Sequence, residues 1–450
     1  MEYPDVIAPS QAFPAWRFAL LLSAIASVGF VLFRPAAPER NPDVFVVLVD
    51  TLRPDHLGTY GYDRPTSPAI DRIAASGTVF ERAYTVAPWT NPSVSTLLTG
   101  LYPRALFAPT PPEGGYRQAM PRKVRTLASR FRSAGYATAA LVDHPAIASP
   151  PLGFLRDFER VVRLSPEADR VWKTKAASAD AIAATVTDAV AGRRPEFVYL
   201  HLVQPHWPYE PVPPYKGMFG PGATSRERSE KDRQASIDDY DAEIRWADDC
   251  IAAVERALRA SGRWQHTWLV VMSDHGEGFF EHGLSDHGNS YYEELLRVPL
   301  VIRAPGGKRV LPPRVSTPVS TIDLAPTLLA MAGLPAAREL PGRSLLDASS
   351  IAGRKLLFAE DAVLLPPEQA AVIEGSTKWV RATTDALYDL DADPGEHLPI
   401  AGQEAERARL AEALRVHDRR NAERRGGTAA TPAQLPDETV ERLRALGYAL

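Results

Sequence analysis

The chain has 450 residues, of which 45% are hydrophobic and 24% are charged, and this balance is ordinary for a globular protein with a sizeable buried core. A formal net charge of −4 argues against a general nucleic-acid binder, which would carry a basic face. The single cysteine, Cys250, excludes an internal disulfide and a zinc site built from cysteines.

The first apolar segment is the charge-free run 18–33, flanked by Arg17 and Arg34. It is slightly short for a membrane-spanning helix and slightly long for the apolar core of a signal peptide. Because no small-residue cleavage site lies directly behind it, the sequence favours a retained membrane anchor over a cleaved signal or a buried helix. The flanking arginines only weakly favour a cytoplasmic position for the rest of the chain.

The next segment, 43–50, is a continuous run of apolar, mostly β-branched residues that ends in an acid. Such a run predicts a strand buried on both faces, as in a parallel sheet. Ligands of open α/β sheets gather at the carboxyl ends of the strands, so Asp50 is well placed for a site. A helix with start and stop signals comes next, over 67–77.

The segment 88–100 predicts a short helix with a hydroxyl at its start. Asn91 is a preferred N-cap, Pro92 suits the first helical position, and Gly100 is a natural stop. The hydroxyl of Thr90 is then expected beside the unpaired N–H groups of a helix start, where anions are favoured. Taken alone, the segment fits an ordinary capped helix better than a reactive site.

Helices and strands continue to alternate as far as residue 338, which is typical of an α/β domain. The expected helices and strands lie over 124–134, 137–142, 173–191, 197–203, 235–261, 267–272, 298–303 and 323–333. Beyond them, short strands near 356–359, 370–374 and 379–383 indicate an α+β region. The charged helix over 404–425 is expected to be a solvated packing helix.

These patterns divide the chain into five parts. We expect an N-terminal anchor or signal segment, a linker, a catalytic α/β domain, a C-terminal α+β subdomain and a helical tail, over residues 1–34, 35–42, 43–338, 339–400 and 401–450. The sequence contains no internal repeats.

Histidines and acids gather behind the strand expected over 267–272, at Asp274, His275, His282 and His287. Core histidines rarely cluster in this way. The adjacent pair Asp274 and His275 suits a cation that accepts both oxygen and nitrogen ligands. Behind the strand over 197–203, prolines on both sides hold a further histidine, His206, in a rigid loop.

Together these segments predict a site around one divalent cation, with Asp50, Thr90, Asp274 and His275 as ligands. A cation touching the threonine oxygen would lower the pKa of the hydroxyl and make it a nucleophile near neutral pH. The cation and the helix start would stabilise charge on a tetrahedral group such as phosphate or sulfate. Carboxylate-rich ligation with one histidine fits calcium, magnesium or manganese, with zinc as a further candidate.

The three other histidines named above, His206, His282 and His287, are candidates for binding the anionic group or for protonating the leaving oxygen. For each of them a purely structural role stays open.

With these residues in view, the chain resembles the sulfatase family of the alkaline-phosphatase superfamily from about residue 44 to about residue 398. The matching segments are 47–58, 92–103, 201–209, 273–283, 293–299, 323–327 and 387–396. The resemblance implies an α/β/α sandwich around a mixed, mostly parallel sheet, a smaller C-terminal α+β subdomain, one divalent cation (usually calcium) and cleavage of sulfate esters. By position it makes Asp50, Asp274 and His275 metal ligands, Thr90 the nucleophile and His206 a substrate contact.

Several residues depart from the family pattern. Sulfatases carry Cys or Ser at the position of Thr90 and convert it to formylglycine, and threonine has no evident route to that group, so we expect no formylglycine. Val94 replaces the usual stabilising arginine, and Thr51 replaces the second acid of an Asp-Asp pair. His287 lies near the position of a substrate-binding lysine. Threonine as nucleophile is similar to phosphodiesterase, phosphoglycerol-transferase and phosphoethanolamine-transferase branches, where the hydroxyl attacks phosphorus.

The sequence therefore predicts a metal-dependent hydrolase of small sulfuric or phosphoric esters, with direct attack by Thr90 and with His206 and His287 as further catalytic residues. The alternatives are a membrane-anchored phospho-group transferase and a catalytically silent binding protein. No nucleic-acid partner is expected. Most proteins of this type with an N-terminal anchor act outside the cytoplasm, so we expect an extracytoplasmic catalytic domain held at a membrane.

Overall fold

The computed structural model describes residues 41–108, 118–164, 178–223, 228–361, 369–426 and 432–446. Within these ranges no helix combines the length and the apolar character that crossing a membrane requires. The apolar run 18–33, on which the membrane prediction rests, lies outside the described residues.

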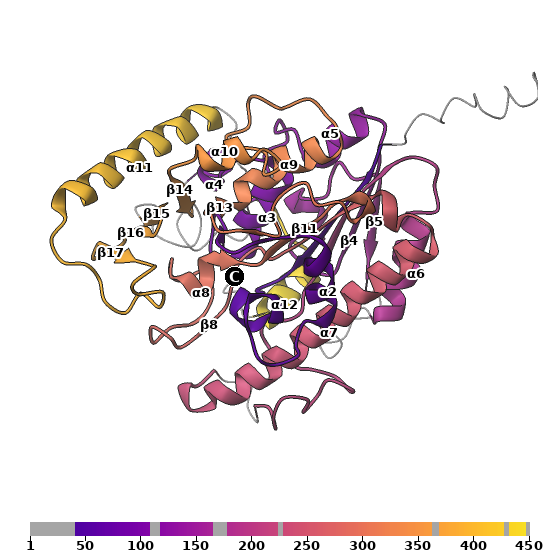
Figure 1. The fold of residues 1–450 in the computed structure, drawn as a ribbon, viewed down its shortest axis with the longest axis horizontal. Coiled ribbons are helices and arrows are strands. Elements are labelled where there is room, and N and C mark those ends of the chain that lie inside the picture. Colours follow the sequence, from indigo (N-terminus) through magenta and orange to yellow (C-terminus); the bar gives the residue numbers. More distant parts are fainter. Residues whose placement is uncertain are drawn as a thin grey trace, which may run out of the picture. The chain divides into compact units, whose positions relative to one another are not determined.

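A mixed sheet forms the centre of the main domain, with helices around it (Figure 1). Its eight strands have the order β12-β2-β11-β7-β1-β6-β4-β5. The strands are β1 (Asp43–Val49), β2 (Thr78–Phe80), β4 (Ala137–Val142), β5 (Arg160–Arg163), β6 (Glu196–Leu202), β7 (Thr267–Met272), β11 (Leu300–Arg303) and β12 (Arg314–Val315). The five strands from β7 to β5 are parallel, and β11 runs antiparallel to β7 and β2. The mostly parallel sheet that the resemblance implied is confirmed.

Helices cover both faces of this sheet, because alternate residues of β1 enter two different cores. Val46 and Leu48 belong to one core, and Val47 and Val49 belong to the other. The first core is closed by α3 (Thr90–Thr99), α5 (Leu127–Ser133), α9 (Leu324–Met331) and α12 (Asp437–Ala445). The second core is closed by α2 (Pro68–Ser76), α6 (Ala179–Ala189) and α7 (Arg233–Ala260). The result is an α/β/α sandwich.

Shorter elements surround the sandwich. They are β3 (Ala83–Tyr84), α4 (Pro103–Leu106), β8 (Gly278–Phe279), β9 (Ser285–Asp286), α8 (Glu293–Leu296), β10 (Arg297–Val298), β13 (Val319–Ser320) and α10 (Ala348–Ala352). The strand expected over 298–303 is interrupted at Pro299, and β10 pairs with β3 whereas β11 joins the central sheet. Proline cannot donate a ladder hydrogen bond, which explains the break.

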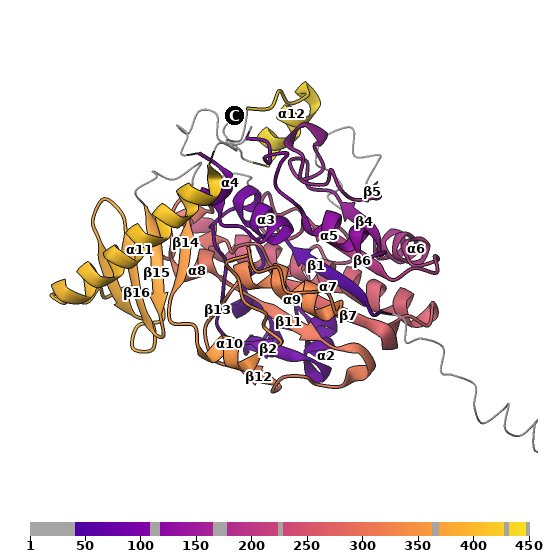
Figure 2. The same cartoon turned by 90° about the horizontal axis from the view of Figure 1, so that it is seen from above.

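The C-terminal subdomain is a four-stranded antiparallel sheet covered by one long helix (Figure 2). Its elements are β14 (Leu357–Glu360), β15 (Ala370–Glu374), β16 (Thr377–Arg381), β17 (Ala386–Asp389) and α11 (Glu404–Arg425). Leu410 and Leu414 of α11 pack against Val372 and Trp379 of the sheet. The next helix, α12, was not predicted, and it returns to the main core through Leu443.

Candidate active site

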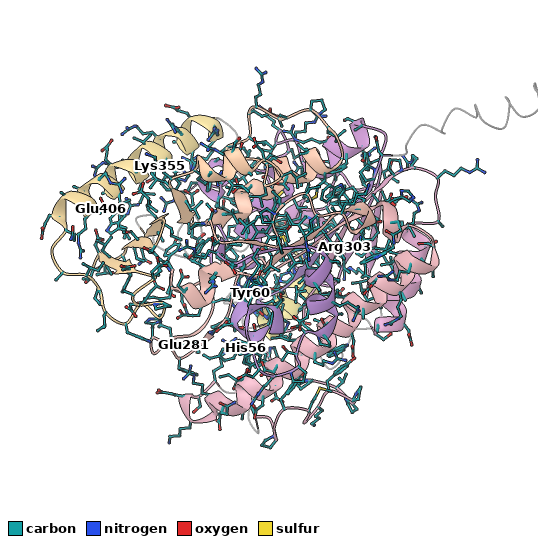
Figure 3. The ribbon with its side chains drawn as sticks, viewed as in Figure 1. His56, Tyr60, Glu281, Arg303, Lys355 and Glu406 are labelled. Atoms are coloured by element: carbon teal, nitrogen blue, oxygen red, sulfur yellow. The ribbon has the colours of Figure 1, made fainter. Side chains whose placement is uncertain are left out.

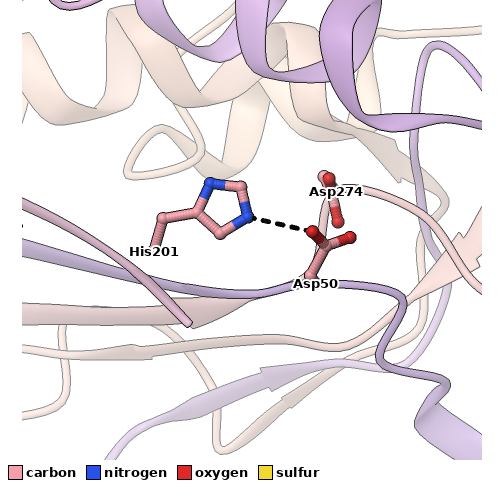
Figure 4. A group of neighbouring side chains, drawn as sticks. All are labelled: Asp50, His201 and Asp274. Carbon is pink, nitrogen blue, oxygen red and sulfur yellow. Dashed lines mark hydrogen bonds and ion pairs between the residues drawn. The ribbon is translucent and has the colours of Figure 1, made fainter. Parts of the chain in front are cut away.

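Three neighbouring parallel strands, β7, β1 and β6, end at the same edge of the central sheet. The register places Leu48 of β1 opposite both Met272 of β7 and His201 of β6. Asp50 and Asp274, which come directly after β1 and β7, therefore emerge together beside His201 (Figure 4). All three side chains are fully buried, and their ligand atoms lie close enough together to hold a metal ion.

The two carboxylates have the properties of a site built for a divalent cation. Asp50 Oδ1 and Asp274 Oδ2 are buried and accept no hydrogen bond within the described part of the chain. Burial and the charge of Asp50 raise the pKa of Asp274 well above its usual range. Against the effect of burial, the hydrogen bond from His201 and nearby imidazoles hold the pKa of Asp50 well below its usual range. A cation would satisfy both oxygens and relieve the repulsion, so the residues fit a divalent metal.

Thr90 is the first residue of α3 and joins this site. Its Oγ1 lies 3.1 Å from His275 Nε2, and Nδ1 of the same ring lies 2.8 Å from the Gly276 carbonyl oxygen. Burial lowers the pKa of His275 to about 4, which favours the neutral ring. Nδ1 then donates to the carbonyl, and the Thr90 hydroxyl donates to Nε2. His275 Nε2 is also 3.5 Å from an oxygen of each aspartate, so the four predicted ligands lie together.

Hydrogen bonds between the loops fix this geometry. Ser273 Oγ accepts from the Leu52 amide at 2.9 Å, and Ser93 Oγ of α3 donates to the Asp274 carbonyl at 2.8 Å. Thr51 has a left-handed backbone with φ of 53°, and its carbonyl accepts from Tyr240 Oη at 2.7 Å. The first turn of α3 and the turns after β1 and β7 are therefore held against one another.

The helix that carries Thr90 begins slightly earlier than predicted. Trp89, with extended backbone, precedes the first turn without a side-chain cap, so Asn91 and Pro92 lie inside the helix. Gly100 ends it in the left-handed conformation, with φ of 75°, as expected. Thr90 keeps its expected place at the positive end of the helix.

His206 and His287 line the same centre. The ring centroid of His287 lies 4.5 Å from that of His275 and 4.9 Å from that of His206. His287 Nδ1 is 3.0 Å from Asp286 Oδ1 and 3.3 Å from Glu277 Oε1. Against the effect of burial, these two acids raise the pKa of His287 to about 10.

His282 lies elsewhere. Its ring stacks on Tyr292 with centroids 3.6 Å apart, and its Nδ1 is 2.8 Å from Glu294 Oε1. It lines a cavity of about 300 Å³ together with Glu281, which Figure 3 labels, and His397. Among the described residues, the structure does not bring His282 to Thr90, and its predicted role in substrate binding stays a prediction.

Sequence reasoning gave no role to three residues around this centre. His201 Nε2 lies 3.3 Å from Asp50 Oδ2, and His144 Nε2 lies 3.9 Å from the same oxygen. Arg228 lies 3.5 Å from Glu277 and contacts Asp286 at 3.3 Å. His144 is just behind the end of β4, so the strand-end rule that selected Asp50 could have found it, whereas His201 is inside β6.

Comparisons with known proteins identify the family and the fold. Residues 42–334, more than half of the chain, match the family model described as Sulfatase. A Δ4,5-hexuronate-2-O-sulfatase of Bacteroides thetaiotaomicron is 23% identical over 426 residues, covering 81% of this chain and 86% of the relative. A multifunctional alkaline phosphatase superfamily protein of Trinickia caryophylli is 31% identical over 212 residues, 42% of this chain and 40% of the relative.

Among solved structures, the phosphonate monoester hydrolase of Agrobacterium radiobacter superposes with a TM-score of 0.66 at 21% identity, covering 85% of this chain and 96% of that chain. The fold and the family match together define an ester hydrolase with an alkaline-phosphatase-like fold. The chain belongs to the sulfatase family.

Proposed function

We propose that this chain is a metal-dependent hydrolase of sulfuric or phosphoric esters in which the hydroxyl of Thr90 attacks directly. The observation that carries the proposal is the position of Thr90 Oγ1, at the positive end of α3 and 3.1 Å from His275 Nε2. The neighbouring residues that would hold the cation are Asp50, Asp274 and His275, and His201 would orient the Asp50 carboxylate by a hydrogen bond.

The donor set of carboxylates and imidazole, together with the family relationship, favours calcium, and manganese, magnesium and zinc also accept such donors. When bound, the cation supplies Lewis-acid stabilisation of the ester oxygens and lowers the pKa of the threonine hydroxyl. The chain itself places that hydroxyl at the positive end of α3, which also favours the anionic group.

The proposed reaction has two displacements. The Thr90 hydroxyl loses its proton to water, and Oγ forms a bond to sulfur or phosphorus while the bond to the ester oxygen breaks. The leaving alcohol takes a proton from a neighbouring acid. His206 and His287 are the candidates for this acid and for contacts to the anionic group. Water then attacks the group carried on Thr90, which restores the hydroxyl and releases sulfate from a sulfate ester, a phosphate monoester from a phosphodiester, or a phosphonate from a phosphonate monoester.

Threonine at position 90 extends the proposed substrate range from sulfate esters to phosphorus esters. Formylglycine would let a sulfate group leave by expulsion from a hydrated aldehyde, whereas a threonine ester must be opened by attack of water at the central atom. Val94, at the position of the usual arginine, is apolar and supplies no positive charge to the anionic group. Its side chain is fully buried in the main core. Phosphodiesters and phosphonate monoesters therefore belong beside aryl sulfates in the substrate panel.

The test compares Thr90→Ala and Thr90→Ser with the native chain on aryl sulfate, aryl phosphodiester and aryl phosphonate monoester, with each of the four cations. We expect Thr90→Ala to lose at least about a thousandfold in kcat/KM, and Thr90→Ser to keep measurable activity because it retains a hydroxyl. Unchanged activity in Thr90→Ala would exclude the nucleophile. No turnover of any substrate by the native chain would exclude the hydrolase and favour the silent binding protein.

A transferase would behave differently in the same assay. With the aryl phosphodiester as substrate, adding glycerol or ethanolamine would divert the product from the phosphate monoester to a new diester of the acceptor. A hydrolase releases the same amount of the monoester with or without the acceptor. Product analysis by ³¹P NMR separates the two outcomes.

We also propose that the run 18–33 anchors the protein to a membrane with the catalytic domain outside the cytoplasm. The lack of charge in the run supports the anchor, and the extracytoplasmic location follows that of most proteins of this type with an N-terminal anchor, against the weak bias of the flanking arginines. A reporter that is active only after export, fused behind residue 40, should be active and should sediment with membranes. An inactive reporter in the soluble fraction would refute both parts.

A further inference from the structure

A second cavity lies where α11 meets the main domain, and it has a volume of about 430 Å³. Three ring side chains, Tyr102, Phe358 and His417, form part of its lining. The rest of the lining is dominated by basic side chains: Arg343, Arg354, Lys355, Arg420 and Arg424. Lys355 is labelled beside α11 in Figure 3. Among the described residues that line the cavity, none is acidic.

The ring side chains are held in place before any ligand arrives. The His417 ring stacks on Phe358 at 4.0 Å between centroids and meets the edge of Tyr102 at 4.4 Å. His417 Nε2 lies 2.6 Å from Glu360 Oε2, and the other oxygen of Glu360 accepts from the Arg104 amide at 2.8 Å. This part of the cavity is therefore rigid.

The charges around it are largely uncompensated. Arg354 pairs with Asp323, with N–O distances of 2.5 and 2.7 Å. The other four basic side chains are those of Arg343, Lys355, Arg420 and Arg424. All four are exposed, and within the described parts of the chain none of them forms an ion pair. Because the whole chain carries a net charge of −4, a basic composition does not explain this concentration. A concave surface with one sign of charge attracts anions strongly.

The helix places two of these arginines on one face by its period. Arg420 and Arg424 are four residues apart, and His417 precedes Arg420 by three residues and Arg424 by seven, so all three point to the same side of α11. Arg415 and Arg419 lie on another side and contact Glu412 instead. The same helix thus contains a matched pair of arginines outside the cavity.

We propose that this cavity is a second anion-binding site, which takes a small soluble molecule carrying two or more sulfate or phosphate groups. Guanidinium groups bind the oxygens of sulfate and phosphate in a two-pronged geometry, and several such groups converge here. The volume is within the range of small-ligand sites, about 300–1,000 Å³. A ligand with a single charge would leave most of the cationic groups without a counter-charge.

The site is distinct from the ester-cleaving centre and does not depend on the proposed reaction. Thr90 begins α3, and Tyr102 lies just beyond the other end of this helix of 10 residues. At 1.5 Å per residue, about 15 Å separates the two ends.

Isothermal titration calorimetry with a disulfated heparin disaccharide and with pyrophosphate tests the proposal. The native chain should bind both, and Arg420→Ser/Arg424→Ser should weaken binding by about tenfold or more. The matched control Arg415→Ser/Arg419→Ser, on the same helix, should bind as the native chain does. Because both pairs are exposed, circular dichroism should show the native fold in each. Lys355→Gln, from outside α11, should also weaken binding.

Three results would overturn the proposal: no binding of either probe, equal affinities in the two double variants, or binding that is lost in Asp274→Asn. The last result would locate the probes in the ester-cleaving centre. Sedimentation with phosphatidylglycerol vesicles, against phosphatidylcholine vesicles, tests a lipid headgroup as the source of the anion. Vesicle binding that needs Arg420 and Arg424, without binding of the soluble probes, would also overturn it.

Discussion

His201 Nε2 lies 3.3 Å from Asp50 Oδ2, across the boundary between β6 and β1. The other ring nitrogen, Nδ1, lies 2.9 Å from the hydroxyl of Tyr199, two residues earlier in β6. A carboxylate only accepts, so Nε2 carries the proton, and in the neutral ring the tyrosine hydroxyl donates to Nδ1. The hydrogen bonds from Tyr199 to His201 and from His201 to Asp50 thus fix the orientation of the Asp50 carboxylate, which is one of the proposed metal ligands.

Replacing this histidine tests how far the metal depends on it. We expect His201→Ala to weaken the binding of Ca²⁺ or Mn²⁺ by about 10- to 100-fold, because the Asp50 carboxylate loses its orienting donor. Calorimetric titration of the metal-free protein measures the effect. The exposed His266 provides the control, since His266→Ala should leave the affinity unchanged. Equal affinities in the two variants would contradict a role for His201.

Removing the metal should destabilise the folded protein. A cation present at about 100 times its dissociation constant adds roughly 2.7 kcal/mol to the free energy of unfolding. Treatment with EDTA should therefore lower Tm, and added Ca²⁺ or Mn²⁺ should restore it. In Asp274→Asn, which lacks one of the two buried carboxylates, Tm should hardly respond to either treatment. A Tm of the native chain that ignores chelator and cation would contradict the proposed site.

Replacing Val94 by the arginine that is usual in the family should destabilise the fold. Val94 is fully buried and packs in the main core with Leu97 and Leu98, its neighbours on α3. Val94→Arg should lower the free energy of unfolding by about 3 kcal/mol or more, because it buries a charge without a partner. Val161 is 46% exposed on β5, and Val161→Arg should change stability by less than about 0.5 kcal/mol. Urea titration of both variants measures the difference, and a fully stable Val94→Arg would contradict the packing.

The contact between α11 and the main domain should depend on pH through Glu360. Burial tends to raise the pKa of Glu360, but the charge and the hydrogen bond of His417 hold this pKa below its ordinary value of 4.5. A lowered pKa contributes stability that is present above pH 4.5 and is lost as pH falls through the folded-state value.

We therefore expect Glu360→Gln to be destabilised at neutral pH by about 1–3 kcal/mol, through loss of its charge-assisted hydrogen bonds. Its deficit against the native chain should shrink as pH falls below 4.5. Denaturant titrations between pH 3 and 7, run at about one-unit steps, track the difference. Glu412→Gln, on the exposed face of α11, is the control and should show no such deficit. A deficit that is constant with pH would contradict this account.

The sequence was most informative where one physical signal dominated. The unbroken apolar run of β1 identified a buried parallel strand, and the rule that ligands collect at strand ends selected Asp50 and Asp274. The helix start at Thr90 was recognised from Pro92 and Gly100, with an error of about two residues at its first turn.

Other features depended on contacts that no local pattern records. His201 is inside a strand, where a lone histidine is usually an ordinary core residue, and only the register with β1 brings it to Asp50. His282 has the same local sequence character as His287, yet the turn between β8 and β9 separates them. The helix α12 is short and polar, so its docking through Leu443 was not visible from its own periodicity.

The return of α12 to the first core bears on how the protein is made. Leu443 and Leu446 complete an apolar cluster that begins with Val44 in the first strand of the sheet. A nascent chain that has emerged only as far as α11 still lacks Leu443 and Leu446, so part of the first core remains uncovered. Until synthesis has passed residue 446, that apolar surface is one that chaperones would recognise.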